Sequence, residues 1–384
     1  MLASIHDSAA LTQIRGRLRI EPNHVRRLRN DFYKKQQTAE DALQHLPEPQ
    51  RTALGREVAF HALELRSRYD SQLDGASKLL FRTAGGQLLE SVILRIASGR
   101  TSLCVSSQVG CAVRCRFCAT GQMGVPQNLS RDEILDQVIQ ANRLLLPEGR
   151  SLRNVVFMGM GEPFLNEAEV YRALEVLLSP QCFDLSPAHV LVSTVGIPGA
   201  MVRCARRFPR LRMALSLHSA RQEQREELIP AARHYPLDVL REAMVTVTAI
   251  QRQRMMVEYL LLDGLNDTDQ DLNELSAYLH GLRVHINLIP YNPIDTAPDL
   301  RGTAPARRRA FAAGLTAVGF AVTIRYSLGA DVAAACGQLV RCETGTFVSR
   351  AEALRTNNRS ISLEDEFSIR PGRTDELKIR PPVS

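Results

Sequence analysis

The sequence contains no tryptophan, and aromatic residues make up only 5% of its 384 positions. This scarcity argues against a broad base-stacking platform of the kind that holds single-stranded nucleic acid. No apolar run approaches the ~18 residues that a membrane-spanning helix needs. The N-terminus, MLASIHDSAA, also lacks the basic and then apolar order of a secretion signal. We therefore expect a cytoplasmic protein with no membrane partner.

The overall composition is that of an ordinary globular protein. Hydrophobic residues make up 45% and charged residues 23% of the chain, which excludes a chain that is disordered throughout and a fibrous repeat. At roughly 150 residues per domain, the length suggests two or three domains. The net charge of +7 permits a nucleic-acid partner but does not by itself indicate one.

Cysteine is scarce and unevenly distributed. Eight cysteines are too few for a disulfide scaffold, and thiols are normally reduced in the cytoplasm. Cys111, Cys115 and Cys118 follow one another closely enough for a single loop to wrap them around one soft metal centre. Structural zinc takes four ligands and ferredoxin-type clusters take four cysteines, so three ligands would leave one iron of a four-iron cluster open to a substrate. The alternative is a chance group of buried thiols.

Composition divides the chain into four stretches. Residues 1–75 are polar and are predicted to form a helical accessory domain, whose basic stretch from Arg26 to Lys35 either contacts RNA or is a solvated helix face. Residues 76–100 are predicted to connect this domain to the main one, 101–344. Apolar periodicity is lost after about 345, so residues 345–384 are predicted to form a mobile, disordered tail.

Between residues 101 and 344, short apolar runs alternate with helical patterns. Repeated strand–helix units imply a parallel sheet, and six of them fit an α/β fold built as an incomplete (β/α)6 barrel. A doubly wound sheet is the alternative. The clearest helix follows Ser130, which forms a capping box with Glu133. Strands are predicted at Leu103–Ser106, Val155–Met158, Val190–Val195, Met213–Leu217, Val257–Leu262 and Ile286–Ile289, with a further candidate at Val322–Arg325, and later helices at about 166–178, 199–208, 237–249, 269–280 and 305–317.

Small and polar residues follow four of the predicted strands. They are Gly159–Pro163, Ser193 with Thr194, Ser216–His218, and Asn292. The carboxyl ends of parallel barrel strands form the mouth in which active sites lie. Each motif alone is weak, because Gly-x-Gly is common in turns and a lone Ser or His is more often structural. Together they favour a functional site at these strand ends.

Two arginine-rich stretches have no assigned role. Arg203, Arg206, Arg207, Arg210 and Arg212 form one, and Arg307–Arg309 form the other. Contact with phosphates and exposure on solvated helix faces would produce the same pattern.

The three-cysteine loop, with Phe117 before its last cysteine, resembles that of the radical S-adenosylmethionine superfamily. Seven motifs in order resemble one family within it, the RlmN/Cfr family of adenine-methylating RNA enzymes. The resemblance runs from about Glu90 to Leu339, and the helical N-terminus is compatible with that family's accessory RNA-binding domain. The motifs are LCVSSQVGC (103–111), MGMGEP (158–163), VSTVGI (192–197), LSLH (215–218), LDGLND (262–267), NLIP (287–290) and ACGQL (335–339).

The resemblance implies which residues hold the cofactors. Cys111, Cys115 and Cys118 match ligands of one [4Fe–4S] cluster, whose open iron takes the amino and carboxylate groups of S-adenosylmethionine. Two molecules of S-adenosylmethionine are used per turnover. Glycine allows close approach of the backbone to a ligand, and a carboxylate accepts hydrogen bonds from an ammonium group. The residues that match cofactor contacts are Gly161, Glu162, Ser193, Ser216, Leu217, His218 and Asn292.

The resemblance also implies how the methyl group moves. Cys336 matches the cysteine that is first methylated, because an sp² ring carbon has no lone pair for a polar methyl transfer. A 5′-deoxyadenosyl radical then abstracts hydrogen from the S-methyl group, and the carbon radical links Cys336 to the adenine. Cys104 matches the thiol that resolves this link through a Cys104–Cys336 disulfide, since thiolates are nucleophilic and readily oxidised. Glu90 resembles a family glutamate assigned as proton acceptor, and a surface carboxylate is the alternative.

Substrate and partners follow from the same resemblance. The family methylates carbon 2 or carbon 8 of adenine, the latter in antibiotic resistance, and carbon 2 is the prediction here. The expected RNA is 23S ribosomal RNA, with transfer RNA as a second candidate, and the expected reductant is a flavodoxin or ferredoxin. A radical enzyme on a non-RNA substrate and a cluster-binding RNA-interaction protein are the alternatives. Cys182, Cys204 and Cys342 match no catalytic position and are predicted to be bystanders.

Overall fold

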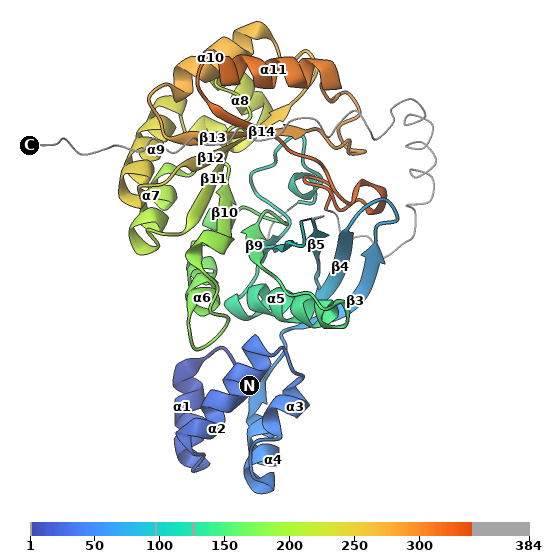
Figure 1. The fold of residues 1–384 in the computed structure, drawn as a ribbon, viewed down its shortest axis with the longest axis vertical. Helices are drawn as coiled ribbons and strands as arrows, with labels where there is room; N and C mark the ends of the chain where they lie inside the picture. Colours follow the sequence, from blue (N-terminus) through green and yellow to red (C-terminus); the bar gives the residue numbers. More distant parts are fainter. Residues whose placement is uncertain (1, 97, 125–126, 340–384) are drawn as a thin grey trace, which may run out of the picture. The chain divides into compact units, whose positions relative to one another are not determined.

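The computed structural model describes residues 2–96, 98–124 and 127–339. Its centre is a ten-stranded mixed sheet with the order β14-β13-β12-β11-β10-β9-β6-β5-β4-β3 (Figure 1). Strands from β14 to β6 in this order pair in parallel, and β5, β4 and β3 continue the sheet in antiparallel pairs. The strands are β3 (Leu63–Asp70), β4 (Ala76–Thr83), β5 (Leu88–Arg95), β6 (Thr101–Cys104), β9 (Asn154–Phe157), β10 (Val190–Thr194), β11 (Arg212–Ser216), β12 (Met255–Leu261), β13 (Val284–Pro290) and β14 (Ala321–Ile324).

Helices follow the parallel strands as the sequence predicted, and they flank the sheet (Figure 1). The α/β class and the strand–helix alternation are confirmed. Ser130 and Glu133 form the predicted capping box at the start of α5, because each side chain bonds the other's backbone amide. The helices of this part are α5 (Arg131–Leu145), α6 (Glu167–Leu178), α7 (Pro198–Arg207), α8 (Gln222–Leu228), α9 (Leu237–Gln251), α10 (Asp269–Leu279) and α11 (Pro305–Ala317).

The two faces of the parallel strands differ in chemistry, because side chains alternate along each strand. Phe157, Val192 and Leu215 on one face are buried in the main hydrophobic core, which also contains side chains of the surrounding helices. On the other face, strand register pairs Ser216 with Glu258 across β11 and β12. We call this second face the inner face. Its polar side chains cannot serve as core, and it is where the predicted site residues gather.

The antiparallel strands correct the prediction for the first hundred residues. Residues 76–100, predicted as a connection, form β4 and β5, and Leu63–Asp70, predicted as helix, forms β3. β3 shows the alternating burial of a strand with one solvated face. In the central sheet, the strands from β6 to β14 pair in parallel as predicted, and β3, β4 and β5 make the whole sheet mixed.

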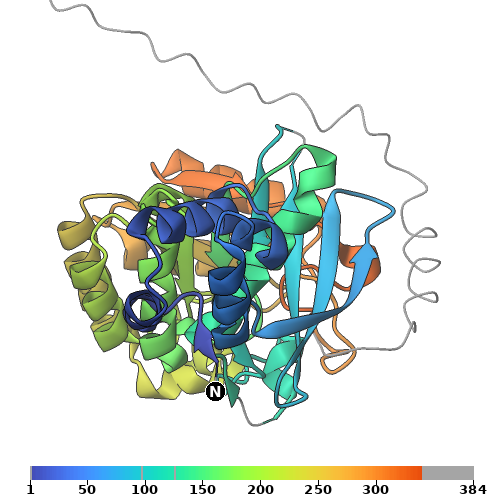
Figure 2. The same cartoon turned by 90° about the horizontal axis from the view of Figure 1, so that it is seen from below.

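The N-terminal helices build a second hydrophobic core. In Figure 2 these blue helices lie against one another, and the core that they enclose also receives Ile139 of α5 and Cys182. A short parallel pair joins β1 (Ala3–Ser4) to β2 (Val58–Ala59). The helices are α1 (Ser8–Arg17), α2 (Pro22–Arg29), a π-helical turn (Asn30–Lys34), α3 (Ala39–Leu43) and α4 (Glu48–Glu57).

Two further predictions concern the C-terminal tail and membrane-spanning helices. The predicted tail, residues 345–384, lies outside the described residues. Within the described ranges, no helix is long and apolar enough to cross a membrane.

Candidate active site

Polar side chains of the neighbouring strands β10, β11 and β12 meet Arg325, which follows β14, on the inner face. Ser193 Oγ on β10 lies 3.4 Å from Ser216 Oγ on β11 and 3.5 Å from Glu258 Oε2 on β12. Arg325, directly after β14, holds its Nη1 3.7 Å from Glu258 Oε1. Burial raises the pKa of the Glu258 carboxyl, and Arg325 and Asn287 oppose this rise. The structure thus brings the predicted Ser193 and Ser216 together around a buried carboxylate that was not predicted.

Two thiols belong to the same group of charges. Burial raises the pKa of Cys104 to about 12, the nearby Cys336 adds to the rise, and Arg325 opposes it. Cys336 is in turn the largest cause of the raised pKa of Arg325, with Glu258 and Cys104 acting in the same direction. Asn292 Nδ2 donates to the Cys336 carbonyl at 3.1 Å. Cys104 and Cys336, far apart in the sequence, therefore lie near one guanidinium.

The segment that carries Cys336, residues 327–339, is anchored at both ends. On one side, the hydroxyl of Ser71 in the β3–β4 turn donates to Asp331 Oδ1 at 2.8 Å. On the other side, the Ala119 amide donates to the Gly337 carbonyl at 2.7 Å. Ala119 directly follows the three-cysteine loop. The antiparallel strands thus take part in the site, because their turn holds the Cys336 segment across from that loop.

The three cysteines of the loop share one environment. Cys111 and Cys115 are buried, and Cys118 is partly buried. Burial raises the pKa of the Cys111 thiol to about 12 and that of Cys115 well above its ordinary value, and neighbouring thiols of the loop add to both shifts. Gly121 packs beneath the loop so closely that a Cβ there would lie 3.0 Å from the Cys115 nitrogen. The loop therefore holds three thiols within reach of one another's charge.

Gly161 and Glu162 connect this loop to the strand ends. Glu162 is buried, and its carboxylate accepts from the amides of Val195 at 2.9 Å and Phe164 at 3.1 Å. Burial raises the Glu162 pKa to about 7, which those hydrogen bonds oppose. Gly161 has a φ of +97°, and a Cβ there would lie 2.5 Å from Gln108 Cβ. From the sequence, Gly161 was expected to let the backbone approach a ligand closely. In the structure, the space beside Gly161 is filled by Gln108.

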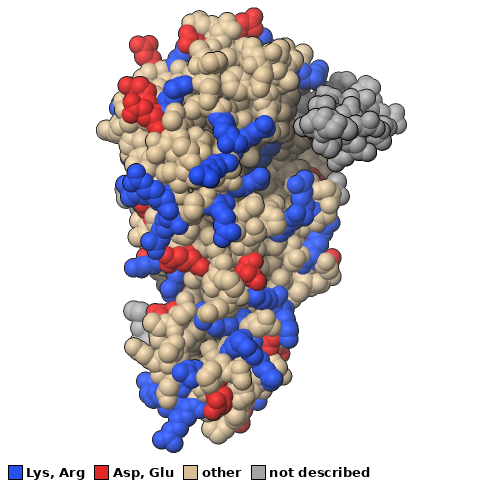
Figure 3. Space-filling model, turned by 60° about the vertical axis from the view of Figure 1, so that its left-hand side comes forward, with Lys and Arg blue, Asp and Glu red and all other residues tan. Residues whose placement is uncertain are grey.

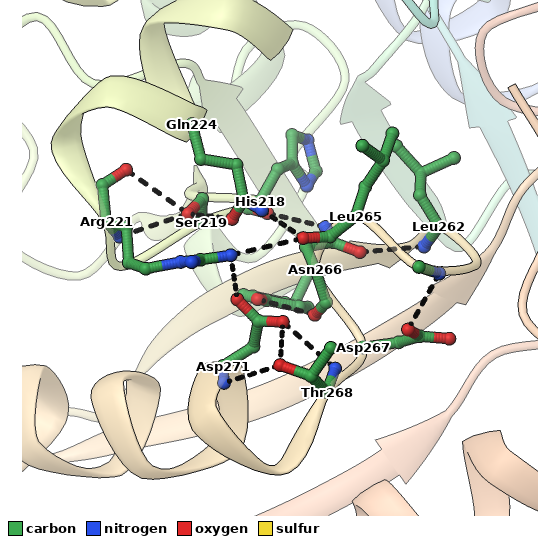
Figure 4. Close-up of polar contacts among 12 residues, drawn as sticks. His218, Ser219, Arg221, Gln224, Leu262, Leu265, Asn266, Asp267, Thr268 and Asp271 are labelled. Carbon is green, nitrogen blue, oxygen red and sulfur yellow. Dashed lines mark hydrogen bonds and ion pairs between the residues drawn. The ribbon is translucent and has the colours of Figure 1, made fainter.

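His218 is held in place by the LDGLND motif (Figure 4). Asn266 Nδ2 donates to the carbonyls of His218 at 2.7 Å and Leu260 at 2.6 Å. His218 Nδ1 accepts from the Leu260 amide at 3.0 Å, and burial lowers the His218 pKa to about 3. The neutral ring therefore carries its proton on Nε2, and it stands edge-on to Phe117 at 4.8 Å between centroids. Leu217 was predicted as a contact, but its side chain lies in the main core, so only its backbone is available.

Comparisons with known proteins decide the family. The model of the radical SAM superfamily matches residues 105–276. A probable RNA methyltransferase of Rhodopirellula baltica is 48% identical over 94% of this chain and 92% of its own length. A probable dual-specificity RNA methyltransferase RlmN of Thermus thermophilus is 43% identical over 77% of this chain and 82% of its own. The chain belongs to the RlmN/Cfr family.

A solved structure agrees with this assignment. A radical SAM methyltransferase from Sphaerobacter thermophilus is 35% identical, with a TM-score of 0.84 over 89% of this chain and all of that one. Like its family, the protein is an S-adenosylmethionine-dependent RNA methyltransferase with a radical mechanism. It works with one [4Fe–4S] cluster and with two molecules of S-adenosylmethionine per turnover.

The donor set of the loop fits the cluster of an RlmN/Cfr enzyme. Three cysteine ligands leave one iron of a four-iron cluster open to a substrate. No group of three or more His, Cys, Asp or Glu side chains in the described ranges is arranged to hold a metal ion. In a four-iron cluster each cysteine binds a different iron, so its thiolates stand further apart than the ligands of a single ion. Cys111, Cys115 and Cys118 lie close enough for their charges to raise one another's pKa.

Glu90 is not the surface carboxylate that the sequence had left as an alternative. It lies on β5 with no exposed side-chain surface, and its Oε1 is 3.2 Å from Lys78 Nζ on β4, which is equally buried. Val92, two residues further along β5, pairs with Cys104 across β5 and β6. Because residues two apart share a face, Glu90 and Cys104 both lie on the inner face.

Four charged residues of the site were not predicted: Lys78, Arg225, Glu258 and Arg325. Arg225 is fully buried and donates to the carbonyls of Leu217 and Val195, which follow β11 and β10. Lys78 and Glu258 each interrupt an apolar run, ASKLLF and MMVEYLL. A charge inside a buried strand is costly unless it is paired, so this interruption was a signal that could have identified both.

The bystander cysteines are in part accounted for. Cys204 lies in the main core on α7, and Cys182 in the N-terminal core with its Sγ 3.2 Å from Arg29 Nη2. Both are buried. Cys342 lies outside the described residues.

Proposed function

We propose that this protein methylates carbon 2 of an adenine in 23S ribosomal RNA, with transfer RNA as a second substrate, through a methylated Cys336. The observation that carries the proposal is the shared environment of Cys104, Cys336 and Arg325 on the inner face, next to the three-cysteine loop. A thiol pair of this kind has no use in an enzyme that only generates a radical. One thiol can form a covalent link to RNA, and the second can release that link by forming a disulfide with the first.

The chain's own groups can be given roles in that release. In the adduct, one methylene carbon joins the adenine ring to the sulfur of Cys336. The Cys104 thiolate attacks that sulfur, the S–C bond breaks with its electron pair on carbon, and the carbon takes a proton to become the methyl group. A Cys104–Cys336 disulfide remains, and two electrons from a cellular reductant restore both thiols. Arg325 favours the thiolate of Cys104, whose pKa burial would otherwise raise further.

Glu90 is proposed to take the proton that leaves the ring carbon, and the unpaired electron that radical addition leaves on the ring would return to the oxidised cluster. Support comes from its position on the inner face, diagonal to Cys104, and from its buried contact with Lys78. Lys78 Nζ, 3.2 Å from Glu90 Oε1, holds this carboxyl group in position on the inner face.

The cofactor contacts are proposed to orient S-adenosylmethionine at the mouth of an incomplete (β/α)6 barrel. When bound, the cluster supplies the electron that cleaves S-adenosylmethionine. Glu162, held by two backbone amides, offers a fixed acceptor for the ammonium group. Ser193, Ser216, His218 and Asn292 surround the same strand ends, where a neutral His218 offers its Nε2 proton.

The proposal also includes a cytoplasmic location and a protein that donates single electrons. The disulfide formed in each turnover needs reduction, which a cytoplasmic setting supplies. We infer a flavodoxin or ferredoxin as the donor of single electrons.

Mass spectrometry of nucleosides tests the substrate. RNA from cells with and without the protein is digested, and 2-methyladenosine and 8-methyladenosine are quantified in 23S ribosomal RNA and transfer RNA separately. We expect 2-methyladenosine to disappear with the protein. Loss of 8-methyladenosine alone would replace carbon 2 by carbon 8, and no change in either nucleoside would contradict an RNA adenine substrate.

The role of Cys336 has its own test. Cys336→Ala is expected to keep its iron and to lose all RNA methylation, whereas Cys204→Ala, which removes a buried thiol of the main core on α7, keeps both. Methylated RNA formed by Cys336→Ala would remove Cys336 from the methyl transfer.

A further inference from the structure

Three arginines stand in one row at the amino ends of the parallel strands. Arg212 is the first residue of β11, and Arg254 and Arg283 immediately precede β12 and β13. Ala214 pairs with Met256, and Met255 with Val284. Continuing this register by one or two residues brings Arg212 next to Arg254 and Arg254 next to Arg283. We call these three residues the arginine row.

The arginine row is exposed and lacks acidic neighbours. Arg212, Arg254 and Arg283 are all exposed, and none forms an ion pair with a carboxylate in the described part of the chain. The turns that carry them, RRFPRLR (206–212), IQRQRM (250–255) and HGLRVH (280–285), contain no Asp or Glu. Arg206, Arg210 and Arg252 are likewise exposed in these turns. Figure 3 shows Lys and Arg side chains gathered across the middle of this side of the molecule, in the region of α7 and α9, with few Asp or Glu among them.

Two other arginines of the Arg203–Arg212 stretch are paired with carboxylates. Arg203 Nη2 lies 2.6 Å from Glu167, and Arg207 is paired with Glu175. Both glutamates belong to α6. The structure therefore separates the arginine-rich stretch into residues whose charge is compensated and residues whose charge is not.

A row of like charges opposes folding. Strands lie about 4.8 Å apart, and like charges directly opposite one another in a sheet are destabilising. Their field is felt inside the sheet: burial lowers the pKa of His285, which is half-buried, and Arg254 and Arg212 lower it further. Binding of an anion to such a row is favourable, because the anion relieves the repulsion between the arginines.

We propose that the arginine row binds the phosphate backbone of RNA, as a second contact away from the reaction centre. The proposal rests on RNA being the substrate. Arginine matches phosphate oxygens with two parallel N–H donors and is the side chain best suited to this recognition. Glu258 of the site lies four residues along β12 from Arg254, which is about 13 Å. The row thus lies outside the reaction centre, at the opposite end of the strands from the predicted mouth.

Salt dependence of RNA binding tests the proposal. The triple variant Arg212→Gln, Arg254→Gln, Arg283→Gln is compared with the native enzyme and with a control triple, Arg172→Gln, Arg203→Gln, Arg207→Gln, whose arginines are paired with glutamates. Each protein, loaded with its cluster, is titrated with a 23S ribosomal RNA transcript at several salt concentrations. We expect the slope of log K against log salt to fall in magnitude by about 2 to 3 in the row variant and much less in the control.

The outcomes separate this proposal from the proposed function. Methylation of a short hairpin from the same RNA reports the reaction centre, and we expect the row variant to methylate it at the native rate. An unchanged salt slope in the row variant would overturn the proposal even where methylation is intact. So would native RNA binding combined with weakened, salt-sensitive binding of an acidic flavodoxin, since the row would then serve the electron donor.

Discussion

At the scale of single residues, the Lys78–Glu90 pair combines a structural and a proposed chemical role. Both side chains are fully buried, and Lys78 also lies over the Tyr69 ring at 5.5 Å. Removing one partner of a buried ion pair typically costs about 3–5 kcal/mol, whereas replacing both by apolar residues is often neutral. We expect Lys78→Met to lower the free energy of unfolding by that amount, and Lys78→Met with Glu90→Met to restore most of it, as measured by urea denaturation.

Activity in the double variant separates the two roles. If Glu90 takes the ring proton, the stable double variant still methylates Cys336, which adds one methyl mass to its peptide, and forms no methylated RNA. Normal RNA methylation in this variant would leave the pair with a structural role only.

The site residues that lie in a motif or at a characteristic spacing were predicted from the sequence. Those that belong to the site only through a contact with another strand were missed. Cys111, Cys115 and Cys118 were found because a short loop fixes their proximity. Arg325 and Glu258 lie on different strands, and their contact depends on how the sheet is ordered. No local pattern reports that order, so the contact could not be predicted.

At the scale of elements, the N-terminal helices enclose a histidine that cannot easily ionise. His6 is buried, its Nδ1 lies 2.9 Å from Tyr33 Oη, and burial lowers its pKa to about 4. The unfolded chain binds a proton at this residue below about pH 6.5, and the folded chain does so only below about pH 4. The contribution of His6 is therefore present above pH 6.5 and is lost as the pH falls towards 4, by about 3 kcal/mol at most.

Urea denaturation between pH 4 and 7 measures this loss. His6→Asn cannot titrate, and its stability is expected to fall less steeply with decreasing pH than that of the native protein. His280→Asn removes an exposed histidine and is expected to leave the steepness unchanged. Parallel curves for native protein and His6→Asn would show that His6 does not titrate on unfolding.

The elements that were predicted correctly are the strands and helices of the repeated strand–helix units. Each parallel strand of the central sheet is a short run rich in apolar residues, and each was found. β4 and β5 instead carry Lys78 and Glu90 in mid-strand and pair with each other in antiparallel fashion, while the turn between β3 and β4 bonds the Cys336 segment far along the chain. The pairing that neutralises these two charges joins different strands and is not visible in the local sequence.

At the scale of the whole molecule, iron content links the loop to the fold. Anaerobically reconstituted protein is expected to bind about four iron ions per chain and to unfold at a higher temperature than the iron-free protein, because a ligand bound only by the folded state stabilises it. Cys118→Ala is expected to lose both the iron and the added stability.

Cys204→Ala serves as the matched control for this measurement. It removes a core thiol outside the loop, so we expect a lower unfolding temperature with the iron content unchanged. Retention of full iron by Cys118→Ala would contradict the three-cysteine assignment.

The most direct test of the account uses the Cys104→Ala variant with RNA, S-adenosylmethionine and a reductant under anaerobic conditions. Without the resolving thiol, the link between Cys336 and the adenine has no route to release. We predict a covalent RNA–protein adduct, and after digestion a peptide whose Cys336 carries adenosine through one methylene group. Free methylated RNA released by Cys104→Ala at the native rate, with no adduct at Cys336, would contradict the account.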